Sequence, residues 1–282
     1  MRLVLVLLSR LPLEMLYAAG EIAAFVAFRV LRWRRAVARA NLLLAFPELC
    51  DAERASLLQR SYRNLGEIIA ETLWSFRATR AEIAARVTIE HPEVVNDETR
   101  AGRSVLLMTA HFCNWEWQVL AGNGVLDRPM HSVYKPRRQA SLDRFAVEAR
   151  GRFGGTPIPH KALTRELIRH RSEPRVYAMV ADQIPTIDEP KHWTRFLGRD
   201  TAFFIGADAI ARILAAPVVF VDMQRVRRGH YRMRLERIGA PPYAPGRGFD
   251  IVERYAQALE REIRTSPADW LWVHNRWKYP KG

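Results

Sequence analysis

The feature that most restricts the fold of this chain is a series of four short apolar runs separated by stretches with helical periodicity. The apolar runs are residues 104–110, 130–134, 175–181 and 217–221. The helices expected between them are residues 115–126, 141–153 and 203–214. Short buried strands that alternate with helices are typical of a parallel sheet. We therefore predict an α/β fold in which a central, mostly parallel sheet is flanked by helices.

The rest of the chain extends this pattern without an obvious break. Residues 52–77 have apolar side chains at helical spacing after a possible N-cap at Asp51, and residues 251–263 are also helical in pattern. Residues 231–238 alternate between apolar and polar, as a half-exposed strand does. No linker divides the chain after residue 50, so we predict one domain over residues 51–282, preceded by a separate N-terminal segment, residues 1–50.

The N-terminal segment has the pattern of a helix at a membrane surface. Residues 11–31 are largely apolar, but Glu14, Glu21 and Arg29 interrupt them. A membrane-spanning helix needs about 18 or more apolar residues with few charges, so this stretch does not have the pattern of a spanning helix. A run rich in arginine, with Trp33 in it, follows directly. We predict an amphipathic helix that anchors the chain at the membrane interface. An ordinary helix packed on the domain and a cleaved signal peptide are the alternatives.

Charge is the unusual part of the composition. The chain has 44 Lys and Arg against 30 Asp and Glu, a formal net charge of +14. Such a chain attracts polyanions, which include nucleic acid, anionic membrane, phosphorylated lipid and acidic proteins. Its basic residues are scattered and no nucleic-acid recognition motif is present, so we predict no nucleic-acid partner. The two cysteines, Cys50 and Cys113, form no disulfide framework, and we expect a reducing compartment.

Polar residues follow each of the four predicted buried strands. His111 and Glu116 come after the first, Lys135 and Arg137 after the second, and Asp182 with Gln183 after the third. The fourth is followed by Asp222 and Gln224. Ligands of open α/β sheets bind beyond the carboxyl ends of the strands. A ligand site is therefore expected among these residues.

The spacing of His111 and Glu116 is not informative by itself, because eight histidines and 30 acidic residues produce about one His-x4-acid match by chance. Its place at a strand-to-helix turn is more informative. There a carboxylate can hold an imidazole while the other ring nitrogen takes a proton from a hydroxyl. A strand-capping histidine, a metal site that includes Cys113, and Cys113 as a nucleophile are the other readings.

Several blocks of sequence occur in the order of one known family. They are 39–42 (RANL), 46–49 (FPEL), 111–116 (HFCNWE), 133–136 (VYKP), 150–152 (RGR), 181–183 (ADQ), 196–198 (FLG) and 270–278 (WLWVHNRWK). Together they resemble the bacterial lipid A biosynthesis late acyltransferases, within the glycerolipid acyltransferases that carry a His-x4-Asp/Glu motif. The resemblance covers almost the whole chain. One position departs from the pattern, because Cys113 stands where glycine is common.

The resemblance implies an acyltransferase that moves a fatty acyl chain from an acyl-carrier-protein or acyl-CoA thioester to a hydroxyl of a phosphorylated glycolipid, expected to be a lipid A precursor. His111 would be the general base, Glu116 would orient it, and Arg150 would contact the acceptor phosphate or the developing oxyanion. The expected substrate-binding residues are Lys135, Arg137, Arg152, Asp182 and Gln183. The resemblance implies no metal or cofactor, and a location at the cytoplasmic face of the cell inner membrane.

Three other functions fit parts of the pattern. Another lipid, such as a different glycolipid, an aminoacyl lipid or a lysophospholipid, could be the acceptor. A hydrolase of lipids or thioesters would use the same His–carboxylate chemistry with water as the acceptor. A lipid-binding protein without catalysis would have no need of His111.

Overall fold

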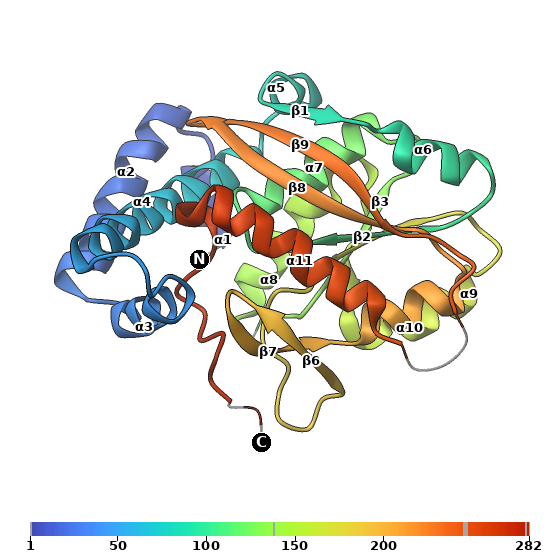
Figure 1. The fold of residues 1–282 in the computed structure, drawn as a ribbon. Coiled ribbons are helices and arrows are strands. Elements are labelled where there is room, and N and C mark those ends of the chain that lie inside the picture. Colours follow the sequence, from blue (N-terminus) through green and yellow to red (C-terminus); the bar gives the residue numbers. More distant parts are fainter. Residues whose placement is uncertain (1, 138, 245–247, 280, 282) are drawn as a thin grey trace.

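A computed structural model describes residues 2–137, 139–244, 248–279 and 281 (Figure 1). Its centre is a seven-stranded sheet in the order β1-β9-β8-β2-β5-β3-β4. These strands are β1 (Val87–Glu90), β2 (Val105–Thr109), β3 (Met130–Tyr134), β4 (Ile158–Pro159), β5 (Val176–Val180), β8 (Val218–Arg227) and β9 (His230–Gly239). All neighbouring pairs are parallel except β8 and β9. The predicted α/β fold with a mostly parallel sheet is thus confirmed.

The four apolar runs of the sequence form four adjacent strands, β8, β2, β5 and β3. All residues of β2 are buried, as expected for a strand covered on both faces. In Figure 1, α11 (Asp250–Thr265) lies in front of β8 and β9, whereas α7 (Trp115–Val125) lies behind the strands. Tyr255 of α11 donates a hydrogen bond to the carbonyl of Thr109, which ties this helix to the end of β2.

The remaining helices pack on the sheet or on other helices. They are α1 (Arg2–Leu8), α2 (Leu13–Phe25), α3 (Arg35–Ala45), α4 (Asp51–Ser75), α5 (Arg80–Ala84), α6 (Glu93–Arg100), α8 (Ala140–Gly151), α9 (Leu163–Arg169) and α10 (Gly206–Ile213). Short helical turns are η1 (Val26–Val30), η2 (Arg152–Gly154), η3 (His160–Ala162) and η4 (Pro267–Asp269). A separate antiparallel hairpin consists of β6 (Lys191–Phe196) and β7 (Arg199–Phe204).

Two predicted element boundaries were wrong. The N-cap of α4 is Cys50, and Asp51 is already helical, because Glu53 accepts a hydrogen bond from the Cys50 amide at 2.7 Å and closes the first turn. The helix predicted from residue 203 begins at Gly206, since residues 203 and 204 pair within the β6–β7 hairpin.

The N-terminal helices α1, α2 and α3 pack on α4, on the left of Figure 1. Gly20 of α2 and Gly66 of α4 meet where the two helices cross, and a Cβ on Gly20 would lie 2.5 Å from the Gly66 carbonyl oxygen. Tyr17 donates a hydrogen bond of 2.8 Å to the buried Glu71. Among the described residues, no helix has both the length and the apolar content needed to cross a bilayer.

Candidate active site

The candidate site lies at the carboxyl ends of two adjacent parallel strands, β2 and β5. Thr109 and Val180 are register partners at these ends. His111 and Asp182 each follow two residues later, so the sheet brings them side by side although 71 residues separate them in sequence. His111 Nδ1 lies 2.8 Å from Asp182 Oδ1. The structure therefore joins two residues that the sequence placed at separate strand ends.

Asp182 is held as a carboxylate by the groups around it. Burial raises its pKa, but the positive charge of a protonated His111 and hydrogen bonds from His111 and Trp270 outweigh burial and hold the pKa below its usual range. The Trp270 indole donates to Asp182 Oδ2 at 2.9 Å. Because both oxygens of this carboxylate accept, Nδ1 of His111 carries a proton and its Nε2 is left as the basic nitrogen. The His111 side chain is 22% exposed, which leaves it accessible.

The carboxylate expected to orient His111 has a different hydrogen-bond partner. Glu116 lies in the first turn of α7 and accepts two hydrogen bonds from Arg150 of α8, at 2.6 and 2.7 Å. Burial raises the pKa of Glu116, but the charge and hydrogen bonds of Arg150 hold it below the usual range. We expected Glu116 to orient His111, but the observed contact from Asp182 takes that place. The physical reason is that Glu116 points to α8, whereas the His111 ring points to β5.

The C-terminal aromatic segment fixes the loop that carries His111. The His111 carbonyl accepts a hydrogen bond from the amide of Leu271, and Phe112 forms an antiparallel bridge with Trp270. Cys113 adopts a left-handed conformation with φ of 47°, and its amide donates to the carbonyl of Asp269. This positive φ accounts for the glycine that is common at the position in the resembling family.

A buried carboxylate on α4 holds the start of the helix that follows this loop. Asn114 is the N-cap of α7, where its side chain accepts a hydrogen bond from the Trp117 amide at 3.0 Å. The same side chain donates to Glu71 at 2.7 Å. Tyr231 of β9 also donates to Glu71, at 2.6 Å. Sequence patterns gave no sign of Glu71 or Trp270 as supports of the site, because their partners are distant in sequence.

The remaining predicted residues lie around the site with different environments. Lys135 and Arg137 are exposed beyond the end of β3, and the positive charge of Arg137 contributes to the lowered pKa of Glu116. Gln183 Nε2 lies 3.5 Å from both ring nitrogens of His111. Arg152 instead donates hydrogen bonds to the carbonyls of Ser75 and Ala78, at and just beyond the end of α4. In this structure Arg152 therefore caps the C-terminus of a helix.

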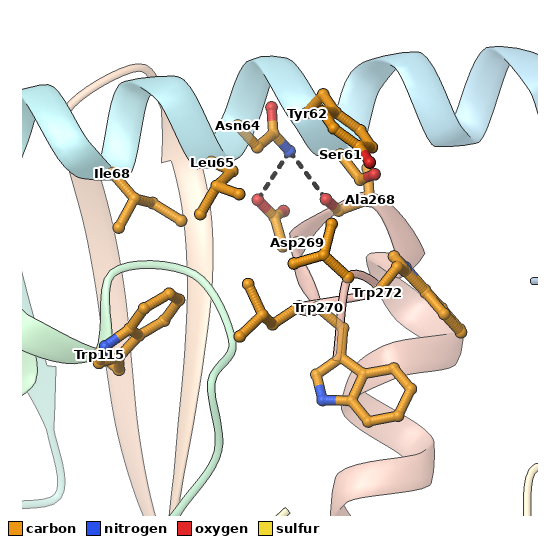
Figure 2. Close-up of a pocket in the computed structure, with 12 residues that line it drawn as sticks. Ser61, Tyr62, Asn64, Leu65, Ile68, Trp115, Ala268, Asp269, Trp270 and Trp272 are labelled. Carbon is orange, nitrogen blue, oxygen red and sulfur yellow. Dashed lines mark hydrogen bonds between the residues drawn. The ribbon is translucent and has the colours of Figure 1, made fainter. Parts of the chain in front are cut away.

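An apolar-walled pocket opens next to His111. The Trp115 ring stands edge-on to the His111 ring, with centroids 5.2 Å apart, and also lines the pocket. Figure 2 shows the other walls, which are one side of α4 and the segment from Ala268 to Val273. The pocket has about 310 Å³ of empty space, the open space at its mouth included. In the part of the chain that the structure describes, no group of three His, Cys, Asp or Glu side chains could hold a metal ion.

The fold and this pocket define an α/β protein with an accessible imidazole, a buried carboxylate partner and an adjacent pocket with mainly apolar walls. The sequence model of the bacterial lipid A biosynthesis acyltransferases matches residues 2–279. This chain therefore belongs to that family and is an acyltransferase.

Curated relatives match this chain over most of their length. The lipid A biosynthesis palmitoleoyltransferase of Escherichia coli (strain K12) is 24% identical over 279 residues, which are 98% of this chain and 89% of the relative. The lipid A biosynthesis lauroyltransferase of the same organism is 24% identical over 281 residues, with the same coverage of 98% and 89%. A lipid A biosynthesis acyltransferase of Haemophilus influenzae is 23% identical over 269 residues, 87% of this chain and 78% of the relative.

Proposed function

We propose that this enzyme transfers a fatty acyl chain from an acyl-carrier-protein or acyl-CoA thioester to a hydroxyl of a lipid A precursor, with His111 as general base. The observation that carries the proposal is the contact between His111 Nδ1 and Asp182 Oδ1 at 2.8 Å. It leaves Nε2 of an accessible imidazole free to take a proton, beside a pocket with apolar walls. Asp182 is the orienting carboxylate in this proposal, in place of Glu116.

The proposed reaction proceeds in two proton-coupled steps. The acceptor oxygen attacks the thioester carbonyl carbon while its proton moves to His111 Nε2, and Asp182 stabilises the imidazolium that forms. The tetrahedral intermediate then expels the thiolate, which takes the proton back from His111. The oxyanion needs fixed donors, for which the amides at the start of α7 and the Nη1 group of Arg150 are candidates. Arg150 uses its Nε and Nη2 groups to bind Glu116.

The direct test replaces His111 by alanine and follows the acylated lipid by mass spectrometry. Turnover should fall by about 10²–10⁴, the usual contribution of a general base, while the melting temperature stays within a few degrees of the wild type. His230→Ala, at the half-buried start of β9, is the matched control and should keep full activity. Full activity of His111→Ala would contradict the mechanism. Release of free fatty acid that added acceptor does not suppress would favour a hydrolase.

The proposed donor entrance is the exposed edge that carries Lys135 and Arg137. Both follow β3, close to the Glu116–Arg150 pair, and would attract an acidic carrier protein. Charge reversal of both residues to Glu should raise KM for acyl-carrier protein more than for acyl-CoA. Equal effects on the two donors would favour acyl-CoA binding or a general loss of structure, and circular dichroism would separate these outcomes.

We also propose that the N-terminal segment binds the cytoplasmic face of the inner membrane. Its exposed apolar side chains include Ile22, Phe25, Val30, Leu31 and Trp33. Arginines lie among them, as in helices that rest on an anionic lipid surface. The double variant Phe25→Ser/Leu31→Ser should sediment less with anionic phospholipid vesicles than the wild type does. Unchanged sedimentation would contradict this binding mode.

A further inference from the structure

At the end away from Trp115, the walls of the pocket beside His111 contact the N-terminal segment. Tyr62 and Val273 line the pocket. Tyr62 donates a hydrogen bond to the carbonyl of Trp33, and Val273 accepts one from Arg34 Nη1 at 3.0 Å. Two wall residues of the pocket are therefore hydrogen-bonded to Trp33 and Arg34, which lie just outside it.

Two arginines at this end have no acidic partner. Arg35 lies over the Phe28 ring at 4.7 Å, and Phe28 packs on Tyr62 with ring centroids 5.2 Å apart. Arg34 uses one N–H group on the Val273 carbonyl. Within the described ranges, no carboxylate lies within ion-pair distance of either guanidinium. Unpaired guanidinium groups at the edge of an apolar pocket are suited to an amphiphile whose anionic group is a phosphate.

We propose that the mouth of the pocket and the two adjacent arginines form the binding site of the acceptor lipid, with an acyl chain along the mouth and a phosphate on Arg34 and Arg35. This inference rests on the proposed function. The pocket walls are mainly apolar, with Leu65 and Ile68 of α4 directed toward its space in Figure 2. Little of its empty space is enclosed, so an acyl chain would lie along the open mouth of the pocket.

The position of this end of the pocket favours the acceptor over the donor. Leu31 and Trp33 are exposed next to Arg34, on the surface proposed to meet the bilayer. A lipid acceptor reaches the enzyme from the bilayer, whereas a carrier protein or coenzyme A comes from water. The donor entrance proposed above, at Lys135 and Arg137, follows β3 and is formed by a different part of the chain. The two substrates would thus approach His111 from separate sides.

The test of the phosphate contact compares two acceptors in detergent micelles at saturating donor. One is a lipid A precursor, and the other is the same lipid after phosphatase treatment. Arg35→Gln should raise KM for the phosphorylated acceptor roughly tenfold, because it removes one charge-assisted contact. KM for the dephosphorylated acceptor should be the same for this variant and the wild type. Arg63→Gln, which removes the same charge from the exposed side of α4, is the control.

The test of the chain contact fills the pocket. Leu65→Trp should raise KM for both acceptors and leave KM for the donor unchanged, whereas Ile69→Trp, on the exposed side of the same helix, should change neither. A rise in donor KM would assign the pocket to the donor and overturn the inference. Unchanged kinetics in Arg35→Gln and Leu65→Trp would also overturn it while the proposed function stands. A wild-type enzyme that acylates neither acceptor would remove the proposed function and, with it, this site.

Discussion

At the scale of single residues, the two carboxylates near His111 have different tasks. Asp182 contacts the imidazole, whereas Glu116 neutralises the buried guanidinium of Arg150. The side chains of Glu116 and Arg150 are 11% and 15% exposed. Removal of either one would therefore leave the charge of the other buried without a counter-charge. Substitutions that keep the shape of each acid should therefore separate orientation of the base from stability.

Asp182→Asn should reduce kcat by about 10²–10⁴ with a small change in melting temperature, because an amide can hold the imidazole in the wrong tautomer. Glu116→Gln should instead cost about 3–5 kcal/mol of unfolding free energy, since Arg150 would stay buried without a counter-charge. Steady-state kinetics and denaturant unfolding of both variants give the comparison. Unchanged stability of Glu116→Gln would contradict the role of this carboxylate as the counter-charge of Arg150.

Cys113 offers a second test at this scale, because its φ of 47° is unfavourable for any residue with a Cβ. Cys113→Gly should relieve about 1 kcal/mol of backbone strain and lose a similar amount of buried side-chain contact, so its stability and activity should stay near those of the wild type. Cys113→Val should be less stable by about 1–3 kcal/mol, from strain and overpacking. Equal stability of the two variants would contradict the role assigned to this backbone conformation.

The sequence located the polar groups of the site better than their contacts. His111, Asp182 and Gln183 were predicted at strand ends, and they are found there. The pairing of His111 with Asp182 depends on β2 and β5 being neighbours, and the order of strands in a sheet is set by packing between distant segments. The order of the strands cannot be read from the spacing of residues in the sequence. For the same reason, the indole of Trp270 could not be assigned to Asp182 in advance.

At the scale of elements, the crossing of α2 on α4 depends on a pair of glycines. An alanine in place of glycine normally stabilises a helix by about 1 kcal/mol. At Gly66 a Cβ would lie 2.4 Å from the Gly20 carbonyl oxygen, so Gly66→Ala should lower the melting temperature instead. Gly124→Ala in α7, where a Cβ would meet no atom within 4 Å, is the control and should raise it. Thermal unfolding followed by circular dichroism would show these opposite signs, and a rise in both variants would contradict the close crossing.

The strands that the sequence missed are short and pair locally or at an edge. β1 has four residues at the edge of the main sheet, and β6 and β7 pair only with each other. Their residues are mixed in polarity, so they lack the apolar run that marked the buried strands. Phe203 and Phe204 fitted the helical spacing of the segment after them, which explains why the predicted helix began too early. Burial on both faces is what made the central strands visible in the sequence.

At the scale of the whole molecule, stability should depend on the protonation of buried imidazoles. Burial, with the positive charge of Arg175, lowers the pKa of His131 from 6.5 to about 4. The unfolded chain binds a proton at this residue in that interval and the folded protein does not, so the stability contributed by neutral His131 is complete above pH 6.5 and is lost as the pH falls toward 4. The melting temperature of the wild type minus that of His131→Leu should therefore decrease as the pH is lowered from 7 to 4.5. A difference that is constant with pH would contradict the burial of a neutral ring.

We expect the N-terminal segment to have two roles, which are to bind the membrane and to support the catalytic part of the chain. Deletion of residues 1–35 should show both. The deletion removes Tyr17, a partner of Glu71, and uncovers the side of α4 around Ala70. Glu71 also holds Asn114 at the start of α7, so loss of this packing should reach the loop that carries His111. We expect a lower melting temperature and lower turnover even with detergent-dispersed substrate. Phe25→Ser/Leu31→Ser should weaken only vesicle binding, because both side chains are exposed. A truncated enzyme with wild-type turnover in detergent would show that the segment serves only as an anchor.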